Sequence, residues 1–244
     1  MSITDRQEQI LHILNERTFV TVSELAQLTY TSPSSIRRDL THMQNSGLVR
    51  RCHGGVSLPA PISGVASFYD RAHKNTHQKR LIAKKAAALL RDGQSILLDS
   101  SSTAAFLLPH IAKHAAVTVF TNNLSTALSA IELGIDTHCL GGRSIGGSAV
   151  LSGVETVRAL GGIRADIVFF SSQSIDRDGT ITDSTEEENF VRECMLRAAK
   201  TSVFLCDSEK FGESALYTLC RLSEVDYAAF DSAYTGVTGN CTLL

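Results

Sequence analysis

The stretch SPSSIRRDLTHMQNSGLVRRCHGGVSL, residues 32–58, decides the fold of the first part of the chain. Ser32 followed by Pro33 combines a helix-capping hydroxyl with a residue that favours the first helical position, so a helix is predicted to begin there. Gly47 stands where such a helix commonly ends, because glycine accepts the left-handed backbone of a C-terminal cap. Two strands and the turn between them are predicted to follow, over Leu48–Arg51, Val56–Leu58 and His53–Gly55.

Two further helices are predicted ahead of this stretch. The apolar residues of Arg6–Asn15 repeat at the spacing of one helix face. Thr21 and Glu24 form a capping-box pattern, in which each side chain hydrogen-bonds a backbone amide at the start of a helix that runs to about Leu28. Three helices followed by a β-hairpin is the layout of a winged helix-turn-helix, whose third helix enters the major groove of DNA.

The third helix is predicted to have one apolar and one DNA-facing side. At about 100° per residue, Ile36, Leu40 and Met43 fall on one stripe, which must face the small core. The other sides carry groups that hydrogen-bond phosphates and base edges, and two arginines extend this surface onto the hairpin. The predicted DNA-binding residues are Ser34, Ser35, Arg37, Arg38, Thr41, His42, Arg50, Arg51 and His53.

Other interpretations of this face are a solvated surface with ordinary arginines, or a module that binds a protein partner instead of DNA. The order of the parts favours DNA: a capped helix, a turn, a helix begun by proline, a glycine stop and a basic hairpin. Asp39 lies inside the basic face. We interpret it as an ion-pair partner that orients Arg37, Arg38 or Arg51, and not as a catalytic or metal-binding group.

Composition sets the broad class. The chain has 244 residues, 43% hydrophobic and 20% charged, which suits one large or two modest globular domains. Its formal charge of −2 excludes a protein that coats nucleic acid by bulk charge, but allows a small DNA-binding surface. No apolar run is long enough for a transmembrane helix, and the N-terminus lacks the apolar core of a secretory signal, so a cytoplasmic protein without a membrane partner is expected. The six cysteines form no CxxC pair and the histidines show no ligand spacing, so we expect neither a metal nor a cofactor.

Two prolines and a glycine in residues 58–64 are typical of a linker. The predicted division is a winged helix-turn-helix over 1–58, a linker over 59–75 and an α/β domain over 76–244. In the last part helical and strand patterns alternate, which predicts an open α/β fold with a mostly parallel sheet. Helices are predicted near 76–91, 103–114, 124–133, 154–161 and 185–199, and strands at 95–98, 117–121, 137–140, 167–170, 203–206 and 227–230.

Polar residues follow five of these strands, at Asp99–Thr103, Asn122–Asn123, Gly141–Arg143, Ser171–Gln173 and Asp207–Lys210. Carboxyl ends of parallel strands meet at one edge of the sheet, where ligands bind, so a pocket is predicted there. The first of these loops also opens a helix, whose N-terminal amides and dipole suit an anion. The alternative is that its hydroxyls only cap the helix.

The first segment resembles the helix-turn-helix of DeoR-type transcriptional regulators. The resemblance is carried by Val22–Ala26, Ser35–Leu40 and Gly47–Val56, and the run Ile-Arg-Arg-Asp-Leu followed by Arg-x-His-Gly-Gly is quite specific. The second segment resembles the sugar-responsive domain of the same family, which is related in fold to ribose-5-phosphate isomerase and the CoA transferases. Its matching pieces include Leu98–Thr103, Thr121-Asn122, Gly141-Gly142, Glu188 and Asp207–Gly212.

The resemblance implies an effector site that holds a phosphorylated sugar or a related metabolite. The residues assigned to it are Asp99, Ser100, Ser101, Ser102, Thr103, Asn122, Gly142, Arg143, Glu188 and Lys210. In the family the first loop usually reads Asp-Ser-Gly-Thr-Thr, and Ser101 replaces the glycine here. Ser171 also stands where the family usually has glycine.

The function implied is a DNA-binding transcriptional regulator, a repressor of a carbohydrate operon, which binds double-stranded operator DNA as a homo-oligomer, either a dimer or a tetramer. The alternative is a sugar-phosphate isomerase-like enzyme with an accessory DNA-binding domain, in which Glu188 is the base and Lys210 the electrophile. The glycine-rich loop expected of a working isomerase is missing around Ile175–Gly179. We therefore expect no enzyme and assign no catalytic residue.

Overall fold

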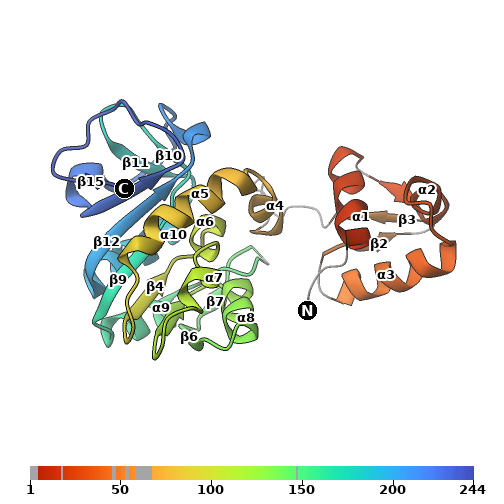
Figure 1. The fold of residues 1–244 in the computed structure, drawn as a ribbon, viewed down its shortest axis with the longest axis horizontal. Helices are drawn as coiled ribbons and strands as arrows, with labels where there is room; N and C mark the ends of the chain where they lie inside the picture. Colours follow the sequence, from red (N-terminus) through yellow and green to blue (C-terminus); the bar gives the residue numbers. More distant parts are fainter. Residues whose placement is uncertain (1–4, 18, 46–47, 53–54, 59–67, 147) are drawn as a thin grey trace. The chain divides into compact units, whose positions relative to one another are not determined.

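The computed structural model describes residues 5–17, 19–45, 48–52, 55–58, 68–146 and 148–244 (Figure 1). The chain divides between Val65 and Ala66 into two compact units, each of which is described by itself. Gly47, His53 and Gly54, which the sequence places at the end of the third helix and in the hairpin turn, lie outside the described residues.

The first unit is a winged helix-turn-helix, as predicted. Its elements are α1 (Asp5–Glu16), β1 (Val20–Thr21), α2 (Val22–Leu28), α3 (Pro33–Asn45), β2 (Arg50–Cys52) and β3 (Gly55–Ser57). The predicted capping box is present, because the Thr21 hydroxyl accepts from the Glu24 amide and the Glu24 carboxylate accepts from the Thr21 amide. The short strand β1 was not predicted; it pairs Val20 with Val56 and completes the antiparallel order β1-β3-β2.

The side of α3 that was predicted to face the core is buried in the first unit. Ile36, Leu40 and Met43 are all 0% exposed. They pack in a core to which α1 contributes Ile10 and α2 contributes Leu25, also fully buried. A buried leucine or isoleucine of this kind typically stabilises a domain by 2–5 kcal/mol relative to alanine, so this stripe fixes which side of α3 faces solvent.

The second unit is built on a seven-stranded sheet in the order β15-β14-β12-β9-β4-β5-β6, in which all neighbours are parallel (Figure 1). This confirms the predicted open α/β fold. The strands are β4 (Ser95–Leu98), β5 (Thr118–Thr121), β6 (Asp136–Cys139), β9 (Ala165–Phe170), β12 (Ala199–Cys206), β14 (Tyr227–Phe230) and β15 (Thr242–Leu243). The helices are α4 (Phe68–His73), α5 (Thr76–Ala86), α6 (Ser102–Ala105), α7 (Leu108–Ile111), α8 (Leu124–Glu132), α9 (Val154–Gly161) and α10 (Glu186–Ala198).

Both faces of this sheet are covered by apolar side chains. Along β4, Ile96 and Leu98 pack with residues of α5, α6 and α7, whereas Leu97 packs on the opposite face with residues of α9 and α10. Successive side chains of a strand point to opposite faces, so a strand buried on both faces is a continuous apolar run. That pattern made the central strands easy to predict.

The structure differs from the sequence prediction in three places. Residues 103–114 were predicted as one helix, but they form α6 and α7, because Pro109 lacks the amide needed in a helix interior and lies in the first turn of α7. Residues 68–73, inside the predicted linker, form α4. Six strands of the second unit were not predicted: β7 (Arg143–Ser144), β8 (Leu151–Ser152), β10 (Ser174–Ile175), β11 (Thr180–Asp183), β13 (Tyr217–Arg221) and β15 (Thr242–Leu243).

No helix in the described part of the chain is long and apolar enough to cross a membrane.

Candidate functional site

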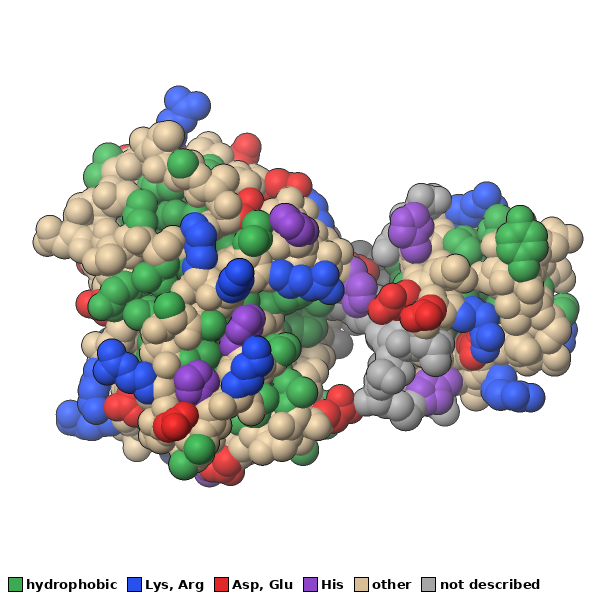
Figure 2. All heavy atoms as spheres, in the orientation of Figure 1, with side chains coloured by type: hydrophobic (Ala, Val, Ile, Leu, Met, Phe, Trp, Pro, Cys, Tyr) green, Lys and Arg blue, Asp and Glu red, His purple; other side chains and the backbone are tan. Residues whose placement is uncertain are grey.

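The outward side of α3 carries most of the predicted DNA-binding side chains. Ser34, Arg37, Arg38 and Thr41 are exposed, and Ser35 and His42 are partly buried. Arg50 and Arg51 are exposed on β2, and His53 lies outside the described residues. The hydroxyl of Thr41 accepts from Nη1 of Arg51 at 3.5 Å, which brings the first wing strand into contact with α3. Figure 2 shows Lys and Arg side chains on the surfaces of both units, together with Asp and Glu side chains.

Asp39 pairs with Arg6 of α1 and not with Arg37, Arg38 or Arg51, which corrects the sequence interpretation. Its carboxylate lies 2.5 Å from Nε and 3.1 Å from Nη2 of Arg6. The hydrogen bond and the charge of Asp39 raise the pKa of Arg6. Asp39, the one acid on α3, is therefore paired with Arg6 and not with the arginines of the outward side.

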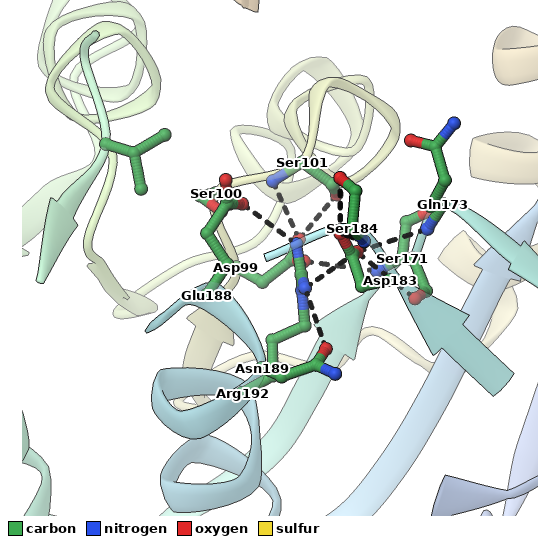
Figure 3. A network of polar contacts seen from close by, with 12 residues as sticks. Asp99, Ser100, Ser101, Ser171, Gln173, Asp183, Ser184, Glu188, Asn189 and Arg192 are labelled. Atoms are coloured by element: carbon green, nitrogen blue, oxygen red, sulfur yellow. Dashed lines mark hydrogen bonds and ion pairs between the residues drawn. The ribbon is translucent and has the colours of Figure 1, made fainter. Parts of the chain in front are cut away.

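A buried ion cluster lies in the second unit, at the carboxyl edge of the sheet (Figure 3). Its centre is Arg192 of α10, whose Nε, Nη1 and Nη2 donate to Asp99 at 2.9 Å, to Asp183 at 2.9 Å and to Glu188 at 3.0 Å. Burial disfavours the charged guanidinium, but the attraction of the three carboxylates outweighs it and raises the pKa of Arg192.

Asp99 uses both carboxylate oxygens inside the protein. It is 0% exposed and accepts from Arg192, from the amide of Ser171 at 3.2 Å, and from the amide and the hydroxyl of Ser101. The Ser101 hydroxyl in turn caps α6 by accepting from the Ala104 amide at 3.1 Å. Asp99 and Ser101, both predicted effector residues, therefore shape the loop through contacts within the chain.

The serine that replaces the usual glycine of this loop needs no unusual backbone. Ser101 has φ −76°, which any residue adopts. Ser102 and Thr103 follow it at 5% and 1% exposure, in the first turn of α6. Ser100 donates to Glu188 at 3.0 Å, which ties the loop to the first turn of α10.

Lys210 brings a second cation to the same edge. Its ammonium donates to the carbonyl of Ser172 at 2.9 Å and to the hydroxyl of Ser171 at 3.4 Å, and it lies 3.7 Å from Asp207. The side chain is 26% exposed, in contrast with the 6% of Arg192. Lys210 therefore keeps donor capacity toward solvent, while the guanidinium of Arg192 is used within the cluster.

Asn122 holds an unused acceptor beside these loops. Its Nδ2 donates to the carbonyl of Leu151 at 2.9 Å, which fixes the orientation of the amide, and its Oδ1 is buried without a partner among the described residues. The next residue, Asn123, donates to the carbonyl of Ser100 at 3.2 Å, so the two loops are directly joined. A buried acceptor without a donor costs about 1–3 kcal/mol.

Two predicted effector residues have other contacts. Arg143 is exposed and lies 3.4 Å from Glu187. Gly142 has φ +112°, and a Cβ there would lie 2.2 Å from the hydroxyl of Thr156, so its glycine is required by the local packing. Among the described residues, no group of three His, Cys, Asp or Glu side chains is arranged to hold a metal ion.

Sequence reasoning did not select Arg192 or Asp183. A signal was present, because Arg192 is a charged residue at a position of α10 whose neighbours Val191 and Met195 are buried apolar residues. A charge at a core position of a helix requires a buried partner, and Glu188 stands one turn before it.

Comparison with known proteins assigns each of the two units to a domain family. The model of a DeoR-like helix-turn-helix domain matches residues 6–61, and the model of the DeoR C-terminal sensor domain matches residues 74–232. The regulator GolR of Listeria innocua is 30% identical over 93% of this chain and 90% of its own length. The glycerol-3-phosphate regulon repressor of Haemophilus influenzae is 27% identical over 91% of this chain and 87% of its own length. The L-fucose operon activator of the same organism is 33% identical over 91% of this chain and 89% of its own length.

Among solved structures, ribose-5-phosphate isomerase A of Methanocaldococcus jannaschii matches with a TM-score of 0.43 and 18% identity, over 57% of this chain and 55% of that one.

Proposed function

The chain belongs to the DeoR family of transcriptional regulators, and from that premise we propose that it represses a carbohydrate operon until a phosphorylated sugar or related metabolite binds its second unit. Its family makes it a regulator and not an enzyme. One relative is named as a repressor and another as an activator, and we propose repression for this chain.

The observation that carries the DNA-binding part is the two-sided character of α3. Ile36, Leu40 and Met43 are fully buried, which directs Arg37 and Arg38 to solvent. Side chains on a recognition helix read base edges, and arginines on a wing bind phosphates. One winged helix buries little DNA surface, so we propose that a homo-oligomer, a dimer or a tetramer, binds two half-sites of one operator in the cytoplasm.

The effector part is supported by the unpartnered Oδ1 of Asn122. An amide oxygen accepts only, so the group that satisfies it must donate, as a sugar hydroxyl does and a phosphate dianion does not. Lys210 and the hydroxyls of Ser102 and Thr103 are donors at the same edge, and they suit an anionic group. The ligand chemistry that fits both kinds of partner is a hydroxylated metabolite with one anionic end.

The geometry disfavours the isomerase alternative. A general base must be within reach of a substrate proton and ready to accept it. The Glu188 carboxylate already accepts from Arg192 and from Ser100, and its side chain is 12% exposed. Asp99 is fully buried and accepts from three residues, so neither carboxylate suits the role of a base.

Two measurements test the proposal. Repeated selection from a random duplex library should enrich one inverted-repeat sequence for the full chain; failure to enrich any sequence contradicts the DNA-binding part. Thermal melting against phosphorylated sugars and their unphosphorylated parents should give a shift with few of them, since a ligand at 100 times its Kd stabilises by about 2.7 kcal/mol. No shift with any member of the panel contradicts the effector part.

A further inference from the structure

The two residues that follow helix α4 contact the loop that carries Lys210. The ammonium of Lys74, which directly follows α4, lies 2.8 Å from Glu209, and Nδ2 of Asn75 donates to Asp207 at 3.2 Å. Hydrogen bonding to Lys74 lowers the pKa of Glu209. Both partners belong to the loop 207–210, so the end of α4 and this loop are joined by two adjacent contacts.

A residue of α5 makes a third contact with the C-terminal end of α4. Lys79 of α5 is 4% exposed. Its ammonium donates to the carbonyl of Lys74 at 2.7 Å and also to the carbonyl of Arg71. These carbonyls belong to the last turn of α4 and to the residue after it, where the helix leaves acceptors unused. Lys79 thus holds the C-terminal end of α4 against α5.

The loop that receives α4 is also part of the candidate effector site. Asp207 lies 3.7 Å from the ammonium of Lys210, which contacts Ser171 and Ser172. Helix α4 also packs beside α6, which begins at the predicted anion-binding loop. Two parts of the candidate site therefore touch the same short helix.

Helix α4 is the first described element after residues 59–67, the segment of chain that leads from the DNA-binding unit. The covalent chain therefore connects α4 to the DNA-binding unit through that segment. Effector control requires a connection between the ligand and the DNA-binding unit that differs between two states.

We propose that Lys74, Asn75 and Lys79 with Asp207 and Glu209, here called the α4 clamp, transmit occupation of the effector site to the DNA-binding unit. This inference rests on the proposed function. An anion that binds the ammonium of Lys210 competes with Asp207 for it, and Asp207 is the residue that holds Asn75. Binding would then change how firmly α4 is held, and the coupling expected between two such sites is about 5–150-fold in affinity.

The other explanation of the clamp is static, namely that it only packs α4 onto the second unit. A double-mutant cycle separates the two explanations without any ligand. Lys210→Met perturbs the candidate effector site. Lys74→Met with Asn75→Gly removes both contacts between the end of α4 and the loop 207–210, and the resulting chain is here called clamp-free although the Lys79 hydrogen bonds to backbone carbonyls remain. Glycine keeps the left-handed backbone of Asn75, whose φ is +56°. The readout is the Kd of the full chain for its selected duplex, by fluorescence anisotropy.

The expected result is non-additive. Lys210→Met should change the Kd by at least about 5-fold in the chain with an intact clamp, and by less than about 2-fold in the clamp-free chain. Lys200→Met is the matched control for the clamp variant, because Lys200 lies 2.8 Å from Asp166 at similar exposure but outside the clamp. In that background the effect of Lys210→Met should be undiminished.

Hydrogen–deuterium exchange gives a second readout. Peptides over residues 68–74 should exchange faster in Lys210→Met than in wild type. If Lys210→Met melts at a much lower temperature than wild type, Ser171→Gly replaces it in the double-mutant cycle. This substitution removes one contact of the Lys210 ammonium and leaves Lys210 itself in the chain. Equal effects in the intact and clamp-free chains, or no effect in either, overturn the clamp alone. A chain that selects no duplex overturns the proposed function and the clamp with it.

Discussion

The guanidinium of Arg192 and the carboxylate of Asp99 meet inside the second unit, with Nε 2.9 Å from Oδ2 and side chains that are 6% and 1% exposed. Arg192 comes from the middle of α10, and Asp99 directly follows β4. Asp183, at the end of β11, binds the same guanidinium. One arginine thus joins three segments at the edge of the sheet where the candidate effector residues lie.

Arg192→Met should therefore strongly destabilise the second unit. It leaves three carboxylates without their shared cation, and removing one partner of a buried ion pair costs about 3–5 kcal/mol. Urea unfolding at neutral pH measures the loss. Arg197→Met is the control, because Arg197 pairs with Glu193 at 64% and 40% exposure, where a pair contributes at most about 1 kcal/mol. Equal losses in the two variants would contradict the central role of Arg192.

Asn122→Leu should weaken the response to the effector. The substitution removes the acceptor that we assign to a ligand hydroxyl, and one hydrogen bond of this kind contributes about 0.5–1.5 kcal/mol. The melting shift given by whichever panel sugar stabilises the wild type most should fall accordingly. Ser129→Ala, at an exposed position of α8, should keep the wild-type shift. An undiminished shift in Asn122→Leu would remove Asn122 from the site.

The sequence was most informative where a local pattern determines the structure. The run Ile96–Leu98 is apolar on both faces because helices cover both faces of the sheet, and that continuity identifies a central parallel strand. The polar residues that end such strands, Asp99 and Asn122 among them, then had to share one edge. The side of α3 that faces the core follows equally well from helical periodicity, since Ile36 and Leu40 are one turn apart.

Pairings between distant residues could not be predicted in this way. Arg192 is 93 residues from Asp99 in the sequence, and Asp39 is 33 residues from Arg6. Many charged residues are available at such separations, and spacing does not choose among them. The choice depends on which segments the folded sheet and helices bring together, so Asp99 was assigned to a ligand although its oxygens are engaged within the protein.

Asp166 should make stability depend on pH at the acid end. Hydrogen bonds from Lys200 and Ser95 lower the pKa of Asp166 to about 2. A carboxylate whose folded pKa lies below its unfolded value of about 3.9 stabilises the fold above that value and loses this contribution as the pH falls toward 2. Asp166→Asn should therefore lower the melting temperature at pH 6 and narrow its difference from wild type at pH 2.5. A difference that stays constant with pH would contradict this assignment.

Arg50→Ala should weaken binding to all duplexes alike. Arg50 is exposed on the first strand of the wing, where a side chain reaches phosphates and not base edges. Loss of one phosphate contact lowers the slope of log K against log salt by about 1. Anisotropy titrations at several salt concentrations, on the selected duplex and on a scrambled one, measure both quantities. An unchanged salt slope would place Arg50 away from the DNA.

Arg38→Ala should act on specificity instead. Arg38 is exposed on α3, on the side opposite the buried Ile36 and Leu40, so it is directed to the base edges if α3 lies in the major groove. Its loss should cost about 1–3 kcal/mol on the selected duplex and much less on a scrambled one. Arg158→Ala removes the same charge from an exposed position of α9 in the second unit, and should leave the ratio of the two affinities at its wild-type value. If Arg38→Ala weakened both duplexes equally, Arg38 would be a phosphate contact, and base recognition would have to be assigned to Arg37, Thr41 and Ser34; if it weakened neither, α3 would not be the recognition helix.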